Sequence, residues 1–92
     1  MVTGSQLRAA RALLNLSVAE LAERTKLAIN TIRKAEGTNG ASPVTAANLE
    51  LLIRALEGAG VLFIPADEIG PGVRLQNPEI TPLKSRRRNI TL

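Results

Sequence analysis

The sequence predicts a mainly α-helical domain of four to five helices that ends in a short C-terminal β-hairpin. Apolar residues recur at helical spacing through the first 60 of the 92 residues. After that point the pattern changes to short β-branched and aromatic stretches separated by a Gly-Pro-Gly turn. We therefore expect a helical domain over residues 1–60, a hairpin over residues 61–76, and a disordered basic tail over residues 77–92.

The first helix is expected over residues 5–15, with Ser5 as its N-cap. Leu7, Ala10 and Leu14 fall on one face at positions i, i+3 and i+7. This face is expected to contribute to the core.

Two short helices follow. The second begins after Ser17, which can form a capping box with Glu20, and should end near Lys26. Its apolar positions are Val18, Leu21, Ala22 and Thr25. The third is expected over residues 28–36 and ends at Gly37, with its apolar face formed by Ile29, Ile32 and Ala35.

The fourth helix, over residues 45–59, has the most regular stripe, formed by Leu49, Leu52, Ile53 and Leu56. Gly58 or Gly60 is expected to end it. Strands are expected over residues 61–65 and 73–75. Because an isolated hairpin is marginally stable and exposes an edge, we expect a second copy of the chain to cover it. The residues expected to mediate this dimer are Phe63, Ile64, Val73 and Leu75.

The net charge is +4, and nine of the twelve basic residues are Arg, a composition that suits a phosphate-rich partner. The alternative, that this charge and the basic run over residues 84–88 only aid solubility, stays open. The chain has neither Cys nor His, so no enzymatic activity, metal or cofactor is expected. With no signal peptide and no long apolar run, a cytoplasmic protein is expected.

The second and third helices together predict a helix-turn-helix. About three residues join them, and Ala22 is small enough to allow a close crossing. Leu27 can fill the space beneath the turn, while Leu21 and Ile32 face each other across it. The second helix of such a unit lies in the major groove of DNA.

These residues also carry a resemblance to a known family. The segment Leu16-Ser17-Val18-Ala19-Glu20-Leu21-Ala22-Glu23-Arg24, followed by Leu27, Thr31-Ile32 and Glu36-Gly37, resembles the phage-repressor/Cro-like helix-turn-helix family, also called Xre-type regulators. The similarity covers roughly residues 5–57. It implies a repressor-like fold and a transcriptional regulator that binds double-stranded DNA as a homodimer on an inverted repeat.

The resemblance also implies roles for individual residues. Those matching its base-reading surface are Ala28, Ile29, Asn30, Arg33 and Lys34. Those expected near DNA phosphates are Ser17, Thr38 and Asn39, although Ser17 can equally be a helix cap alone. Arg11 and Glu36 match a pair that orients the recognition helix, with two independent surface charges as the alternative.

The sequence departs from the family pattern at three positions. Lys26 stands where the turn usually has Gly, and a left-handed conformation there would cost about 1–2 kcal/mol. Val18 replaces a commonly polar residue, and Ala28 replaces the usual hydroxyl cap of the third helix. These departures affect the expected contacts more than the expected fold.

A second function remains open. The chain could be the antitoxin of a toxin–antitoxin pair, binding a protein partner through the segment after Gln76. This function is compatible with DNA binding, because antitoxins often combine the two. Co-purification with a second small protein would distinguish it.

Overall fold

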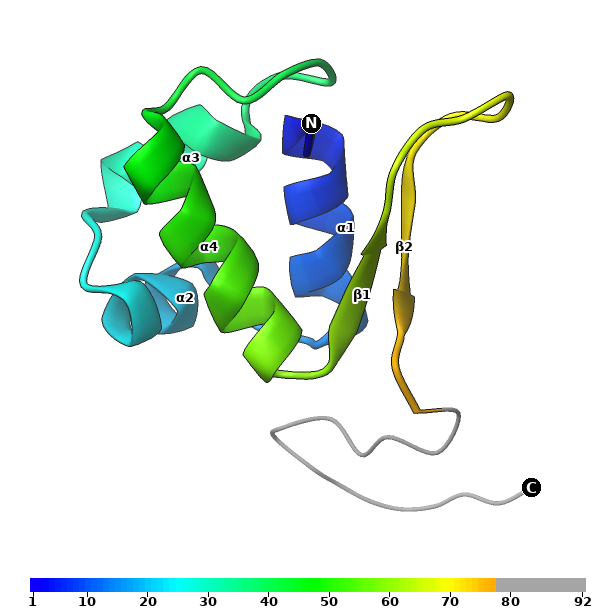
Figure 1. The fold of residues 1–92 in the computed structure, drawn as a ribbon. Helices are drawn as coiled ribbons and strands as arrows, with labels where there is room; N and C mark the ends of the chain where they lie inside the picture. Colours follow the sequence, from blue (N-terminus) through cyan, green and yellow to red (C-terminus); the bar gives the residue numbers. More distant parts are fainter. Residues whose placement is uncertain (78–92) are drawn as a thin grey trace.

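A computed structural model describes residues 1–77 of the chain. Its helices are α1 (Gly4–Leu13), α2 (Val18–Thr25), α3 (Ile29–Glu36) and α4 (Ala46–Gly58), followed by the strands β1 (Val61–Ile64) and β2 (Gly72–Leu75). The predicted mainly α fold with a C-terminal hairpin is confirmed (Figure 1). The expected basic tail, including residues 84–88, lies outside the described residues.

Helix α1 begins and ends earlier than the sequence analysis predicted. Its N-cap is Thr3 rather than Ser5: the Thr3 hydroxyl accepts from the amide of Gln6 at 3.1 Å, and Gln6 Oε1 accepts from the amide of Thr3 at 2.8 Å. The helix ends at Leu13 because Asn15 adopts a left-handed conformation, with a φ of 57°. Asn tolerates this conformation better than most residues, so it can end a helix.

The start of α2 follows the prediction. The Ser17 hydroxyl accepts from the amide of Glu20 at 3.0 Å, and Glu20 Oε1 accepts from the amide of Ser17 at 2.8 Å. Helix α3 has Ala28 as its N-cap and gains no side-chain hydrogen bond there. Helix α4 is capped by Thr45, whose hydroxyl accepts from the amide of Asn48 at 3.2 Å. Hydroxyl side chains therefore cap all the described helices except α3.

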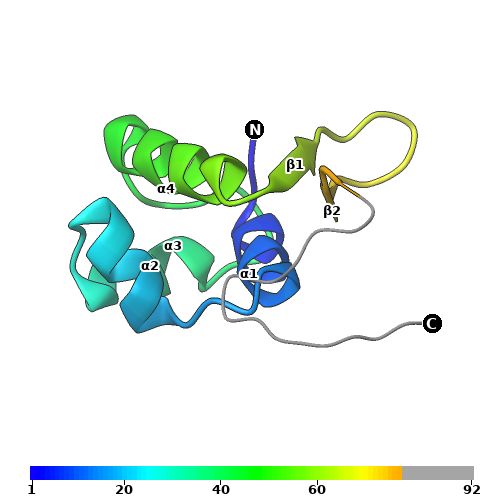
Figure 2. The ribbon, with the colours of Figure 1, turned by 90° about the horizontal axis from the view of Figure 1, so that it is seen from below.

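The helices form two layers. Helix α4 lies over the layer formed by α1, α2 and α3 and contacts both α1 and α2 (Figure 2). The core between them is aliphatic and draws on every helix and on the start of β1. Its buried members are Leu7, Ala10, Leu14, Leu16, Leu21, Ile32, Ala35, Leu52, Leu56 and Val61. Among residues 1–77, no helix is long and apolar enough to cross a membrane.

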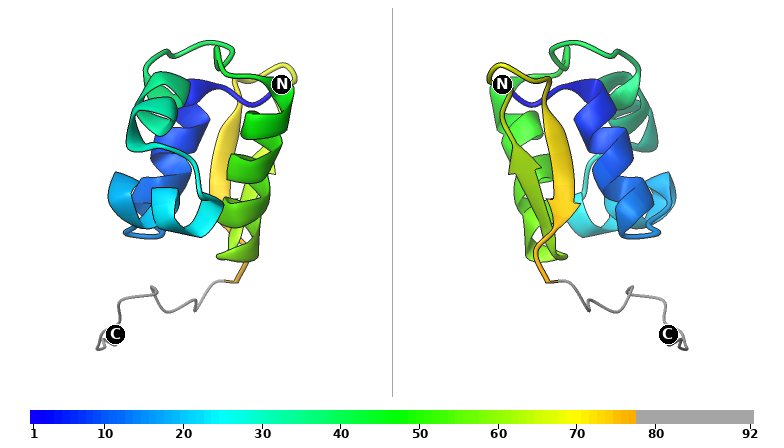
Figure 3. Two further views of the ribbon diagram at one scale, coloured as in Figure 1. Left: turned by 90° about the vertical axis from the view of Figure 1, so that its left-hand side faces the viewer. Right: turned by 90° about the vertical axis from the view of Figure 1, so that its right-hand side faces the viewer.

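The hairpin covers the side of the molecule where α1 and α4 meet (Figure 3). Its strands are antiparallel, and Phe63 lies opposite Val73. Because side chains alternate between the faces of a strand, Val61, Phe63, Val73 and Leu75 share the inner face. The last three pack, half-buried, against the core, in which Val61 is completely buried.

The two faces of the hairpin divide the residues expected to mediate dimerisation, whose role in a dimer stays a prediction. Phe63, Val73 and Leu75 contact the core of their own chain, so they do not form an outward apolar surface. Of the predicted set, only Ile64 lies on the outer face, together with Leu62 and Arg74. The sequence could not distinguish the two faces because residues 61–64 are all apolar.

Candidate nucleic-acid interface

Helix α3 has one buried face and one exposed face. Ile32 and Ala35 are completely buried, and Glu36 is 5% exposed. Four of the residues predicted to read bases lie on the exposed face, namely Ile29, Asn30, Arg33 and Lys34, and the fifth, Ala28, is exposed at the N-cap. Because the helical period separates these two sets, packing against α1 and α2 leaves the whole predicted base-reading set accessible to solvent.

The turn between α2 and α3 is held by internal hydrogen bonds. Lys26 adopts the left-handed conformation that is costly for a non-glycine residue, with a φ of 65°, and its amide donates to Ala22 O at 2.7 Å. Buried Thr25 donates through its hydroxyl to Leu21 O at 2.8 Å and accepts from the amide of Leu27 at 3.3 Å. Thr25 therefore bridges the end of α2 and the turn, a role that its apolar spacing did not reveal.

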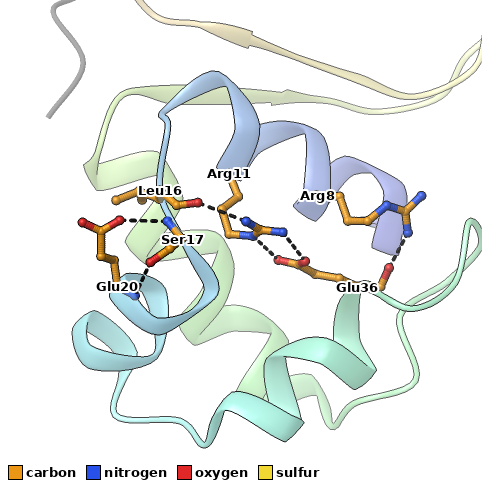
Figure 4. A network of polar contacts seen from close by, with 6 residues as sticks. All are labelled: Arg8, Arg11, Leu16, Ser17, Glu20 and Glu36. Atoms are coloured by element: carbon orange, nitrogen blue, oxygen red, sulfur yellow. Dashed lines mark hydrogen bonds and ion pairs between the residues drawn. The ribbon is translucent and has the colours of Figure 1, made fainter. Parts of the chain in front are cut away.

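An ion pair joins α1 to the end of α3 (Figure 4). Arg11 Nε and Nη2 donate to the two carboxylate oxygens of Glu36, each at 2.9 Å. Arg11 Nη1 also donates to Leu16 O at 3.0 Å. The side chain of Glu36 is 6% exposed and that of Arg11 is 22% exposed. The predicted pair is therefore present, and its two parallel hydrogen bonds restrict how α3 can rotate against α1.

The electrostatics of this pair favour a charged Arg11. The hydrogen bond to Glu36 raises the pKa of the Arg11 guanidinium, and burial, which acts in the opposite direction, does not cancel this effect. The negative charge of Glu36 raises the pKa further. Arg11 is therefore a permanent cation in this pair.

A second arginine on α1 holds the loop that follows α3. Arg8 Nη1 donates to Glu36 O and, at 3.3 Å, to Thr38 O, while Nη2 donates to Asn39 Oδ1 at 2.6 Å. The sequence analysis assigned Arg8 no role. One signal was present: Arg8 lies three residues before Arg11, so both side chains project from the same side of α1.

Gly4 allows α1 and this loop to approach closely. Its amide donates to Gly40 O at 3.0 Å, and Thr3 forms an antiparallel bridge with Ala41. A Cβ atom on Gly4 would lie 2.1 Å from Thr38 O. No side chain fits there, so Gly is required for this contact.

The residues predicted to contact phosphate remain accessible. Ser17 is exposed at the start of α2, although its hydroxyl is part of the capping box. Thr38 is half-buried and its hydroxyl accepts from the amide of Gly40 at 3.1 Å, while Asn39 is exposed. In Figure 4, Ser17 and Arg8 lie on opposite sides of the Arg11–Glu36 pair. Possible phosphate contacts therefore lie on both sides of this pair.

Positive charge gathers over the end of α2, the turn and α3. Residues 1–77 contain eight Lys and Arg residues against seven Asp and Glu residues, so this part of the chain is almost neutral. Residues 24–34 nevertheless contain four basic residues and no acidic one, and all four are exposed: Arg24, Lys26, Arg33 and Lys34. This segment therefore presents a local positive surface.

No protein-family model matches the chain. In the part of the chain that the structure describes, no three His, Cys, Asp or Glu residues gather in a group that could hold a metal ion. What this surface can bind therefore follows from its shape, charge and hydrogen-bonding groups.

Proposed function

We propose that the protein is a sequence-specific transcriptional regulator that binds double-stranded DNA by placing α3 in the major groove. One observation supports this most directly: four predicted base-reading side chains lie on the exposed face of a helix whose opposite face is fixed in the core, and the fifth is exposed at its N-cap. An α-helix fits the major groove, where each base pair presents a distinct pattern of hydrogen-bonding groups. The proposed function places the protein on the nucleoid.

The exposed residues of α3 offer complementary chemistry for base edges. Asn30 can form two hydrogen bonds with adenine, and Arg33 or Lys34 can donate to guanine O6 and N7. Ala28 or Ile29 can pack against a thymine methyl group. Ser17, Thr38 and Asn39 would position the helix by contacting the sugar-phosphate backbone.

The experiment is selection of bound duplexes from a random pool, followed by binding measurements with Arg33→Ala. We expect an enriched motif, and we expect the variant to lose about 1–3 kcal/mol of discrimination at one base pair. Arg54→Ala is the matched control because Arg54 is an exposed arginine on α4 that pairs with Glu50 at 2.7 Å. Absence of an enriched sequence, together with binding that does not depend on salt, would contradict the proposal.

We further propose that the regulator is a homodimer, with the outer face of the hairpin in the interface. Leu62 is 48% exposed there, beside Ile64. Two recognition helices about 34 Å apart would require an inverted-repeat site. Sedimentation equilibrium should show that Leu62→Glu weakens the dimer. Leu51→Glu, which changes an exposed leucine on α4, should not weaken it. Equal effects of both variants would remove the hairpin from the interface.

The predicted toxin partner stays a prediction. It depends on the segment after Gln76, which lies almost wholly beyond the described residues. No contact described above favours it.

A further inference from the structure

We propose that Arg8 is a positioning residue that turns the amide of Asn39 so that its NH₂ group faces a DNA phosphate. The proposal rests on the proposed function and adds a residue to it that contacts no DNA. In this proposal Asn39 donates the hydrogen bond to the phosphate, and Arg8, on α1, sets the direction in which the Asn39 amide points.

The chemistry of the two side chains determines which way the amide faces. A guanidinium group has five N–H donors and no acceptor, whereas the amide of Asn39 has an oxygen that accepts and an NH₂ group that donates. Arg8 Nη2 lies 2.6 Å from the side chain of Asn39, so the atom that meets it must be the oxygen Oδ1. The NH₂ group consequently points away from Arg8.

The position of Asn39 is restricted as well as its orientation. The same guanidinium donates to Glu36 O and Thr38 O, which lie three residues and one residue before Asn39. On the other side of Asn39, Gly40 O accepts from the amide of Gly4 at 3.0 Å. The Ser5 hydroxyl donates to Asn39 O at 3.4 Å. Backbone contacts before, at and after Asn39 therefore tie this loop to α1.

A phosphodiester fits the groups that this loop presents. Phosphate oxygens only accept hydrogen bonds, so they need donors, and the outward NH₂ group of exposed Asn39 is one. The Thr38 hydroxyl already accepts from the amide of Gly40, so its own hydrogen remains to donate. Both groups are neutral. Contact through them adds affinity without releasing counterions, which predicts a specific salt dependence.

The test is a double-mutant cycle on DNA affinity with Arg8→Ala, Asn39→Ala and the double variant, measured at several salt concentrations. We expect each single variant to bind every duplex about tenfold more weakly, since a hydrogen bond to a charged group is lost. The double variant should bind no more weakly than the weaker single variant. Additive losses would overturn the proposal.

The salt dependence separates positioning from direct contact. If Arg8 acts through Asn39, both single variants keep the wild-type slope of log affinity against log salt. If Arg8 itself contacts a phosphate, Arg8→Ala reduces the slope by about one and the proposal fails. Arg8→Lys keeps the charge, but its single ammonium group cannot donate to all the acceptors that the forked guanidinium reaches. We therefore expect this variant to bind DNA as weakly as Arg8→Ala. Full affinity in Arg8→Lys would also overturn the proposal.

Asn39→Asp separates positioning from a purely structural role. The carboxylate keeps the bond to Arg8 and makes it stronger, so thermal stability should be equal to or above that of the wild type. Its second oxygen would face the phosphate, so affinity should fall below that of Asn39→Ala. Wild-type affinity in Asn39→Asp would contradict the proposal. Binding by the wild type and the effect of Arg33→Ala test the proposed function separately, so the two failures can be distinguished.

Discussion

Helix α3 and the hairpin are attached to α1 in different ways. Helix α3 buries Ile32 and Ala35 in the core, as the hairpin buries its inner face, but it is also held by charged side chains. Arg11 pairs with the carboxylate of Glu36, while Arg8 donates to the backbone carbonyl of Glu36 and to the loop beyond it. The hairpin is held by the apolar inner face of its strands and by one buried side chain, that of Gln6. Gln6 Nε2 donates to Ile64 O at 3.0 Å and to Gly72 O at 2.9 Å.

The difference lies in the directionality of the two attachments. Hydrophobic contacts are non-directional and tolerate small shifts, whereas bidentate ion pairs and a donor fork require specific angles. The proposed DNA-reading helix is therefore fixed in orientation. The hairpin, in contrast, depends on burial and on one amide that also forms the capping box of α1. The following variants test this contrast, from the largest expected effect to the smallest.

Gly4→Ala should have the largest effect on stability. The new Cβ would lie 2.1 Å from a backbone oxygen, so α1 and the loop after α3 must separate. We expect a loss of at least about 3 kcal/mol in the free energy of unfolding, measured with urea. Gly58→Ala, in α4, is the matched control because a Cβ there would have no neighbouring atom within 4 Å. A Gly→Ala change in a helix stabilises the protein by up to about 1 kcal/mol. Equal losses in both variants would contradict the close approach.

Glu36→Gln should destabilise the protein by about 2–3 kcal/mol, because it leaves the charge of Arg11 without its partner. We place the loss below that of a fully buried pair because Arg11 is 22% exposed. The control is Glu50→Gln, whose ion pair with Arg54 is exposed and contributes less than about 1 kcal/mol.

The raised pKa of Arg11 sets the pH dependence of this effect. A raised folded-state pKa contributes stability that is fully present below the unfolded pKa and is lost as the pH rises through the folded one. For an arginine this window is strongly alkaline. We therefore expect the Arg11 contribution to remain constant between about pH 6 and about pH 9 in urea titrations. A loss within this range would show that Arg11 is not the group responsible.

Gln6→Glu should loosen the hairpin selectively. The new carboxylate still accepts from the amide of Thr3 but loses both donors and meets two carbonyl oxygens. We expect a loss of about 1–3 kcal/mol, with amide hydrogen exchange accelerated most in β1 and β2. Gln76→Glu is the control, since its side chain donates only to Val61 O, at 3.3 Å. Uniform acceleration across α2 and α3 would mean that the two attachments are not independent.

Lys26→Gly should give the smallest change, a stabilisation below about 1 kcal/mol. The left-handed conformation costs a non-glycine residue about 1–2 kcal/mol, while glycine loses about 0.5–1 kcal/mol more chain entropy on folding. Lys34→Gly, at an exposed position within α3, should instead lower the free energy of unfolding by about 1 kcal/mol. Destabilisation by Lys26→Gly in thermal melts would show that the turn uses the lysine side chain.

Local patterns predicted most of the fold and much of the candidate site. The predicted helices and both strands are present, and the predicted capping box of Ser17 and Glu20 is observed. The start of α1 was assigned to Ser5 although Thr3 and Gln6 already form a capping box by the rule applied at Ser17. The role of Arg8 could not be predicted from the sequence. Two of its acceptors are backbone carbonyls about thirty residues away, and a backbone carbonyl has no sequence signature.

By itself, the sequence determined which segments form helices and where α2 begins, because hydrogen bonds and side-chain spacing within a few residues control both. It placed Ile29 on the apolar face of α3 with Ile32 and Ala35, but only the last two are buried, and Ile29 is 41% exposed. The tertiary structure alone decided that Arg8 orients Asn39 and that Phe63 faces inward. These contacts join residues far apart in the chain. Their partners become neighbours only when the core closes, and no local pattern records which groups will meet.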